Sequence, residues 1–269
     1  MLLPKRLVDS IFKEIFVFTH ERLRENANVL RLLFYGLITQ DDKYVVPALI
    51  MERARYGSLA EYLDRQGGLE AGSDVFPSAD RSGFTPAEKV SICADITTGL
   101  LALHKAGIAH GDVKSDNFLL FDSSEPDIRY QAKISDFGSI ILLNPPRNSQ
   151  SPKYLGTRSW NAPETAFQSG DQYLDSKPIM RCDAYSSGLT MMHVICGTIH
   201  VELMSKGKDV LERAIDTLKH SPLPATLERS MANVITLLLQ WDPNNRCSDL
   251  SVVSEILRPT KDYALADDR

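Results

Sequence analysis

The sequence predicts an α+β fold, in which a small sheet comes first along the chain and a larger set of helices follows. Apolar runs typical of strands lie between residues 29 and 52, whereas apolar positions recur at helical spacing from about residue 180 onward. Short apolar runs broken by polar loops lie between these two parts, after Ala109. Strands that are grouped before helices, instead of alternating with them, are typical of the α+β class.

The first 65 residues are expected to form a helix, an antiparallel pair of strands and a second, short helix. Residues 7–24 carry apolar side chains at roughly helical spacing with charges between them, which indicates one amphipathic helix. Residues 29–39 and 43–52 are apolar runs separated by the turn signal Gln40-Asp41-Asp42. Residues 59–65 follow a serine, which is a common N-cap residue, and are expected to be helical.

The clearest helix start is Thr85-Pro86-Ala87-Glu88, which follows a loop rich in Gly, Ser, Asp and Pro at residues 66–84. Thr85 can cap the helix, proline suits the first helical position, and Glu88 can complete a capping box. We expect this helix to continue to about Lys105 and to stop at Gly107.

The composition is that of an ordinary soluble globular protein, with 43% hydrophobic and 24% charged residues and a formal net charge of -5. No Lys/Arg cluster interleaves with aromatic residues, so no nucleic-acid partner is expected. No apolar run approaches the roughly 20 residues of a membrane span, and the first residues lack a signal-peptide pattern, so no membrane partner is expected. The four cysteines are far apart and form no C-x-x-C pair, which fits a reducing compartment, the cytosol or the nucleus.

The segment His110-Gly111-Asp112-Val113-Lys114-Ser115-Asp116-Asn117 holds the residue types that phosphoryl transfer requires. An aspartate such as Asp112 can orient a hydroxyl and accept its proton, and a lysine such as Lys114 can neutralise the charge of the moving phosphoryl group. An asparagine such as Asn117 can hold magnesium. The spacing alone is also compatible with an ordinary polar loop.

Asp136-Phe137-Gly138 follows a short apolar run at residues 132–134. An aspartate at a strand end, next to a glycine that lets the chain turn, suits a second magnesium ligand. Asp/Gly turns after strands are common, so it is the position of this motif after the preceding one that gives it weight.

With these two motifs, the chain from about residue 10 to about residue 257 resembles the protein kinase family. Residues 110–117 are similar to the family's catalytic loop, and residues 136–138 to its D-F-G motif. Residues 156–164, which end in Ala162-Pro163-Glu164, resemble its substrate-docking stretch. Two further segments resemble the start of a buried helix, with Asp183, and a late helix whose Arg246 pairs with Glu164.

The resemblance implies one kinase domain at residues 1–258, followed by a solvated tail at 259–269. Within it, residues 1–52 would be a reduced N-lobe, with one helix, two strands and no counterpart of the family's first three strands. Residues 53–269 would contain the helical C-lobe and the tail. From the residues alone, Asp183 should be a buried carboxylate that backbone N–H groups satisfy. The alternative for Asp183 is an exposed N-cap, and the alternative for Arg246 is a surface charge.

The resemblance also implies ATP and magnesium as cofactors. Asp112 and Lys114 would be catalytic, and Asn117 and Asp136 would hold the metal. Four residues would lie around the adenine, namely Met51, Glu52, Ala54 and Leu119. Glu14 matches the helix glutamate that pairs with the family's ATP-binding lysine, although a solvated helix charge explains it equally well.

The chain departs from the family pattern in its first part and at Gly111. It has no G-x-G-x-x-G loop and no matching strand lysine, because no glycine precedes Gly36 and only Lys5 and Lys13 do. A missing upstream exon or an alternative start is the preferred explanation. The uncovered strands would then be a site for a partner. Most members have arginine where this chain has Gly111, so we expect activity that needs no phosphorylation between Ser139 and Leu155.

The expected function is a protein serine/threonine kinase, because Lys114 and Gly156-Thr157 resemble that subclass. Trp160, where tyrosine is commoner, leaves dual specificity open. Two alternatives are a pseudokinase that binds partners and, less favoured, a small-molecule phosphotransferase. The docking stretch and Arg246 argue against the small-molecule enzyme.

Overall fold

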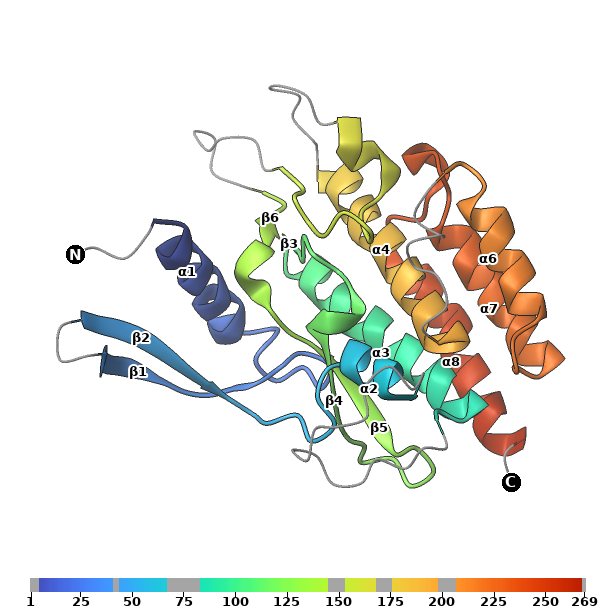
Figure 1. The fold of residues 1–269 in the computed structure, drawn as a ribbon, viewed down its shortest axis with the longest axis horizontal. Coiled ribbons are helices and arrows are strands. Elements are labelled where there is room, and N and C mark those ends of the chain that lie inside the picture. Colours follow the sequence, from blue (N-terminus) through green and yellow to red (C-terminus); the bar gives the residue numbers. More distant parts are fainter. Residues whose placement is uncertain are drawn as a thin grey trace.

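The computed structural model describes residues 5–40, 44–66, 83–144, 153–167, 176–197 and 207–267. Helix α1 (Lys5–Thr19) and the hairpin of β1 (Leu32–Gln40) and β2 (Tyr44–Met51) lie at the left of Figure 1. The larger helical part lies at the right, and short strands lie between the two. Most of the described helices therefore follow the strands, and the predicted α+β class is confirmed. No helix in these residues is long and apolar enough to span a membrane.

Helix α1 is shorter than the predicted helix at residues 7–24. It ends at Thr19, and residues 21–25 form turns. Leu23 is 1% exposed, and its N–H donates to the carbonyl of His20 over 2.9 Å. The predicted helix was too long at its C-terminal end because Leu23, although it is buried like the apolar face of the helix, lies in a turn.

Strands β1 and β2 form the predicted antiparallel pair, with Gln40 opposite Tyr44. The first strand was predicted to begin at residue 29, but residues 29 and 30 pair elsewhere. The N–H of Leu30 donates to the carbonyl of Ile134 over 2.9 Å, and Val29 also bridges to Ile134. These two residues are apolar, buried and extended, so the sequence alone could not show that they lie outside β1. Part of the predicted turn, residues 41–42, lies outside the described residues.

Both predicted helix caps form. At α2 (Leu59–Gln66), the N–H of Glu61 donates to Ser58 Oγ over 3.2 Å, and the N–H of Ser58 donates to the Glu61 carboxylate over 2.9 Å. At α3 (Pro86–Lys105), Thr85 and Glu88 make the same reciprocal pair of bonds. Most of the predicted loop between the two helices, residues 67–82, lies outside the described residues.

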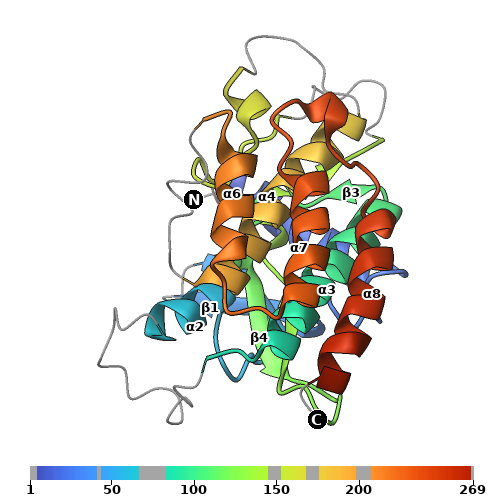
Figure 2. The same cartoon turned by 90° about the vertical axis from the view of Figure 1, so that its right-hand side faces the viewer.

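Helix α3 lies at the centre of the helical part. It packs against α8 (Leu250–Asp267), α4 (Ser176–Cys196) and the strand β5 (Tyr130–Ile134). Figure 2 shows α3 beside α8, and α7 (Ala225–Leu238) packs against α8, α4 and α6 (Val210–Lys219). Helices α3 and α4 carry apolar residues on several faces, as expected of helices inside a core.

Two short antiparallel strand pairs place the chemical motifs. Strand β4 (Phe118–Asp122) pairs with β5, and β3 (Ile108–Ala109) pairs with β6 (Ile141–Leu142). The 3-10 turn η1 (Ser115–Asn117) immediately precedes β4, and η2 (Phe137–Ser139) lies between β5 and β6. Because Phe118 is opposite Ile134, the catalytic-loop motif and Asp136 meet at one end of the β4–β5 hairpin.

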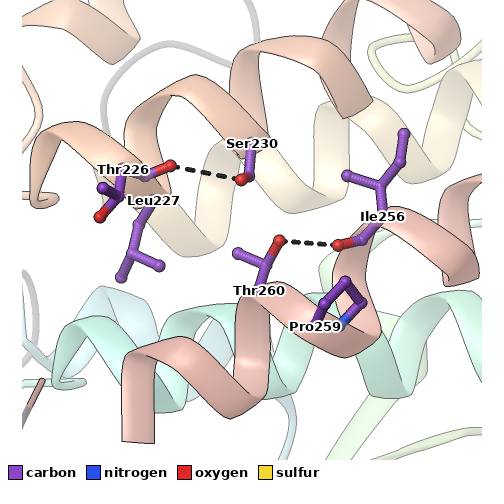
Figure 3. A pocket seen from close by; sticks show the side chains of 6 residues that line it. All are labelled: Thr226, Leu227, Ser230, Ile256, Pro259 and Thr260. Carbon is purple, nitrogen blue, oxygen red and sulfur yellow. Dashed lines mark hydrogen bonds between the residues drawn. The ribbon is translucent and has the colours of Figure 1, made fainter. Parts of the chain in front are cut away.

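Residues 259–267 belong to the predicted solvated tail, and in the structure they continue the last helix. Helix α8 continues to Asp267 and contains Pro259. A cavity of about 390 Å³ lies between α7 and α8, and Figure 3 shows its lining. The Ser230 and Thr260 hydroxyls at this cavity donate to carbonyls of their own helices, those of Thr226 and Ile256. No predicted site residue lines this cavity.

Candidate active site

Three of the predicted site residues lie in direct contact at the catalytic loop. Lys114 Nζ is 3.1 Å from Asp112 Oδ2, and Asn117 Nδ2 donates to the backbone carbonyl of Asp112 over 2.8 Å. The hydroxyl of Thr157 donates to Asp112 Oδ1 over 2.7 Å and accepts from Lys114 Nζ over 3.0 Å. The Asp112 carboxylate is therefore oriented through both of its oxygens, while its side chain remains 13% exposed.

Asp136 follows a backbone contact with Asn117. The N–H of Ser135 donates to the Asn117 carbonyl over 2.8 Å, and the Ser135 hydroxyl donates to the same carbonyl over 3.0 Å. Asp136 then adopts a left-handed conformation, with φ 58° and ψ 77°. A positive φ is unusual for a residue other than glycine and often occurs at functional sites.

Asn117 and Asp136 have atoms that suit magnesium. Asn117 uses its Nδ2 to bind Asp112, so its Oδ1 is the atom that a metal would meet. Asp136 adds a carboxylate, and hard oxygen ligands are those that magnesium prefers. Among the described residues no group of three His, Cys, Asp or Glu side chains could hold a metal. Water and phosphate oxygens would complete the coordination, as is common for magnesium.

Asp183, at 0% exposure, lies beneath the catalytic loop. Its Oδ1 accepts from the Gly111 N–H (3.0 Å) and the Tyr154 hydroxyl (2.9 Å). Its Oδ2 accepts from the His110 N–H (2.8 Å) and contacts His104 Nε2 (2.9 Å). Burial alone would raise the pKa of this carboxyl, but the His104 contact and the other donors outweigh burial and hold the pKa below its ordinary value. The predicted backbone donors are confirmed, and the alternative of an exposed N-cap is wrong.

The predicted Arg246–Glu164 pair forms with two parallel bonds. Arg246 Nη1 and Nη2 donate to the two Glu164 oxygens over 2.6 and 3.1 Å. Arg246 is 3% exposed and also donates to the carbonyls of Gln240 and Arg181. This pair connects the end of the docking stretch, residues 156–164, to the segment before α8, and it is structural.

The residues predicted around the adenine come from three neighbouring elements. Met51 ends β2, Ala54 lies in the segment at residues 52–58, and Leu119 lies on β4. That segment runs along β4, because the N–H of Leu120 donates to the Gly57 carbonyl and Ser58 bridges to Leu119. The backbone of Ala54 makes no hydrogen bond with any described residue.

Glu52 has a second contact that was not predicted. Its carboxylate accepts from Lys133 Nζ over 2.8 and 2.9 Å, and from the N–H of Arg31 over 2.9 Å. Its own N–H donates to the Arg31 carbonyl, so this N–H is already engaged. Glu52 thus fastens the segment at residues 52–58 to β5, three residues before Asp136.

Glu14, on α1, lies near Asp136. Burial raises the pKa of the Glu14 carboxyl, and the negative charge of Asp136 raises it further. Glu14 makes no ion pair with a described residue, and neither β1 nor β2 contains lysine. Neither of these two strands therefore supplies a lysine partner for Glu14.

Sequence reasoning did not assign the contacts made by Thr157, Tyr154 and His104. Thr157 was noted only as a subclass feature, and its hydroxyl is the group that joins Asp112 to Lys114. Tyr154 and His104 complete the donors around Asp183. A buried Asp183 could have indicated further donors, but no spacing rule identifies which distant residues supply them.

Comparison of the sequence with known proteins assigns the chain to a family. The family model "Protein kinase domain" matches residues 5–258. "Serine/threonine-protein kinase PkaB" of Streptomyces coelicolor is 36% identical over 99 residues, 36% of this chain and 24% of that protein. "Probable serine/threonine-protein kinase fnkE" of Dictyostelium discoideum is 24% identical over 86% of this chain and 15% of its own length. "Serine/threonine/tyrosine-protein kinase HT1" of Arabidopsis thaliana is 27% identical over 87% of this chain and 54% of its own length. The chain thus spans between 15% and 54% of the length of these three relatives.

Proposed function

Since this chain belongs to the protein kinase family, we propose that it transfers the γ-phosphoryl group of ATP to serine and threonine hydroxyls of proteins. The observation that carries the proposal is the contact set of Asp112, Lys114, Asn117 and Thr157. These contacts put one oriented carboxylate, one ammonium group and one amide beside each other, which is what phosphoryl transfer needs.

In the proposed reaction, the Asp112 carboxylate accepts the proton of the substrate hydroxyl. The hydroxyl oxygen forms a bond to the γ-phosphorus, the bond between that phosphorus and the bridging β–γ oxygen breaks, and ADP leaves with the electron pair. Thr157 keeps Asp112 in one orientation, because its hydroxyl donates to Oδ1 over 2.7 Å. Correct orientation of reacting groups can lower a barrier by several kcal/mol, about 7–11 kcal/mol in the best intramolecular cases.

Lys114 supplies the positive charge in this proposal. Its Nζ lies within 3.1 Å of Asp112 Oδ2 and 3.0 Å of the Thr157 hydroxyl, so it is held at the place where the phosphoryl group would move. Magnesium, when bound, neutralises phosphate charge. Asn117 through Oδ1 and Asp136 through its carboxylate would hold it.

The serine/threonine preference is supported by Thr157 and by the printed names of the relatives. All three names include serine/threonine, and one also includes tyrosine. Transfer to peptides that contain only serine, only threonine or only tyrosine as the acceptor separates single from dual specificity. We further propose that the protein acts in the cytosol or the nucleus.

The test compares Asp112→Asn with Asp116→Asn in the full chain, using Mg-ATP and a serine/threonine peptide library. Loss of a general base costs about 10²–10⁴-fold in rate, so Asp112→Asn should lose at least about 100-fold. Asp116 lies in the same loop, but its side chain is exposed and has no assigned role, so Asp116→Asn should keep its rate. Wild type that transfers no phosphate, or an Asp112→Asn variant as active as wild type, would exclude the proposal.

A second candidate, a pseudokinase that binds partners, is favoured by the surface of the β1–β2 hairpin. Large apolar side chains on it are strongly exposed, including Phe34 (63%), Tyr35 (64%) and Leu37 (73%). Side chains of neighbouring residues in a strand point to opposite faces, so both faces of the hairpin are apolar. Exposed apolar patches of this kind mark sites where another protein surface packs.

Thermal stability with and without Mg-ATP discriminates the two candidates. Ligand at 100 times its Kd stabilises the folded state by about 2.7 kcal/mol, which raises the melting temperature. A folded chain with no shift, together with no transfer, supports the partner-binding function. The small-molecule enzyme is disfavoured by the docking stretch and by the Arg246–Glu164 pair that holds it.

A further inference from the structure

Tyr154, which lies two residues before the docking stretch at residues 156–164, binds the same carboxylate as the catalytic loop. It is 3% exposed, and its hydroxyl donates to Asp183 Oδ1 over 2.9 Å. The same oxygen accepts from the N–H of Gly111 in the catalytic loop, over 3.0 Å. The chain before the docking stretch and the catalytic loop are thus fastened to one carboxylate oxygen.

Three residues later, the same stretch reaches the reacting groups. Thr157 donates to Asp112 and accepts from Lys114. The carbonyl of Trp160 accepts from the hydroxyl of Ser186, which lies one helical turn after Asp183 on α4. Helix α4 therefore holds both sides of Thr157, through Asp183 on one side and Ser186 on the other.

Hydrogen bonds to a buried carboxylate are strong because water cannot reach the charge and so cannot replace a donor that is lost. A bond to a charged group contributes more than a bond between neutral groups. Burial and the neighbouring Asp183 charge raise the pKa of the Tyr154 hydroxyl well above its ordinary value, so it remains a donor at physiological pH. The Tyr154–Asp183 contact therefore needs no change in protonation near neutral pH, and neither side chain carries a modification.

We propose that Tyr154 is a positioning residue that holds residues 154–160 against the catalytic loop, and that it does so in the unphosphorylated protein. Position 111 carries no side chain, so the loop presents no arginine that could bind a phosphate group. The Tyr154 hydroxyl and the Asp183 carboxylate supply the attachment in its place. The effect on catalysis rests on the proposed function, whereas the attachment itself does not.

The matched variants are Tyr154→Phe and Tyr62→Phe, made in the full chain. Each removes one buried hydroxyl, and Tyr62 donates to the Tyr130 hydroxyl over 2.9 Å, away from the docking stretch. Hydrogen exchange is then measured over residues 153–160 and, as a reference, over α7. Tyr154→Phe should increase exchange at least about tenfold in 153–160 alone, since tenfold corresponds to 1.4 kcal/mol. Tyr62→Phe should leave 153–160 unchanged.

Kinetics separate positioning from a general loss of stability. Tyr154→Phe should raise the peptide KM or lower kcat by about tenfold and leave the ATP KM unchanged. A third variant, Ser149→Ala with Ser151→Ala, should retain wild-type exchange in 153–160 and wild-type rates. Both serines lie outside the described residues.

Unchanged exchange in Tyr154→Phe, or an equal increase in Tyr62→Phe, would overturn the attachment. Loss of protection in the serine double variant would overturn its independence from phosphorylation. If the wild type transfers no phosphate, the proposed function fails, and the exchange result still decides whether Tyr154 holds the stretch.

Discussion

At Gly111 the backbone of the catalytic loop has φ 80°, and its N–H donates to Asp183. A Cβ at this position would collide with the carbonyl oxygen of Ser139, at the end of η2. Glycine adopts a positive φ at little cost, whereas other residues lose about 1–2 kcal/mol there. Gly111 thus allows η2, which begins directly after Asp136, to approach the catalytic loop closely.

Gly111→Ala tests this approach, and Gly107→Ala is its control. Gly107 has nearly the same φ, 75°, but a Cβ there would have no atom within 4 Å. The control should lose about 1–2 kcal/mol of stability from backbone strain alone. Gly111→Ala should lose about 2–5 kcal/mol, because the collision with Ser139 adds about 1–3 kcal/mol. Urea denaturation measures both losses. Equal losses would show that Ser139 moves aside without cost.

Along α1, one face of the helix contacts the whole Asp136-Phe137-Gly138 motif. Ser10, Glu14 and Phe18 are spaced by four residues and therefore lie on one side of the helix. Phe18 packs edge-on against Phe137 at 5.3 Å between ring centroids, and Ser10 lies against Gly138. Glu14 lies near Asp136, whose charge helps raise the Glu14 pKa after the larger effect of burial. Helix α1 is thus the element that supports the left-handed Asp136.

Phe18→Ala tests that support, and Phe12→Ala on the same helix is the control. Phe18 is 6% exposed, whereas Phe12 is 66% exposed. Removing a buried phenylalanine side chain costs about 3–5 kcal/mol. Phe18→Ala should lose about that much in denaturant unfolding and should weaken magnesium-nucleotide binding, measured by calorimetry. Phe12→Ala should lose less than about 0.5 kcal/mol. Similar results for the two variants would contradict the assignment.

Local signals predicted the elements better than contacts between elements. The helix caps predicted at Ser58 and Thr85 set two helix starts from residues a few positions apart, and both form. Strand β1 was predicted to begin three residues too early. Val29 and Leu30 are apolar and extended like the residues of β1, and the sequence does not show that they pair with β5 instead of β2. The end of α1 was missed for a related reason, since Leu23 is buried without being helical.

For the whole molecule, a half-buried carboxyl between α3 and β5, that of Asp95, makes stability depend on pH. Asp95 accepts from the N–H of Ala132 over 2.8 Å. Burial raises the pKa of Asp95 to about 7, and the Ala132 N–H and the charge of Lys261 oppose this only in part. The folded state therefore keeps a proton that the unfolded chain releases near pH 4. Stability should decline as pH rises from about 4 to about 7 and then level off.

Asp95→Asn should remove this decline, because an amide is neutral and can still accept from the Ala132 N–H. The variant should unfold like wild type near pH 4 and should be more stable than wild type at pH 8, on the order of a few kcal/mol. Asp216→Asn, at an exposed position on α6, is the control and should follow wild type at both pH values. Parallel pH profiles for wild type and Asp95→Asn, from thermal unfolding, would refute the prediction.

The proximity of the candidate active-site residues could be predicted only for those residues that lie in the same sequence motif. Asp112, Lys114 and Asn117 lie in one loop, so their order along the chain indicated their proximity. The buried role of Asp183 and its backbone donors also followed from its apolar surroundings and the family pattern. Tyr154, Thr157 and Lys133 act through partners 29, 45 and 81 residues away, and no local pattern specifies such a distance.

The four donors around Asp183 have a consequence for how the chain folds. They come from α3, from the catalytic loop and from Tyr154, up to 79 residues from the carboxylate in sequence. This carboxylate can leave water at low cost only when all of these segments have already come together. Its burial is thus a late, cooperative step, and the same step completes the catalytic loop. We therefore expect partly folded forms of the C-terminal helical part to have an unformed catalytic centre.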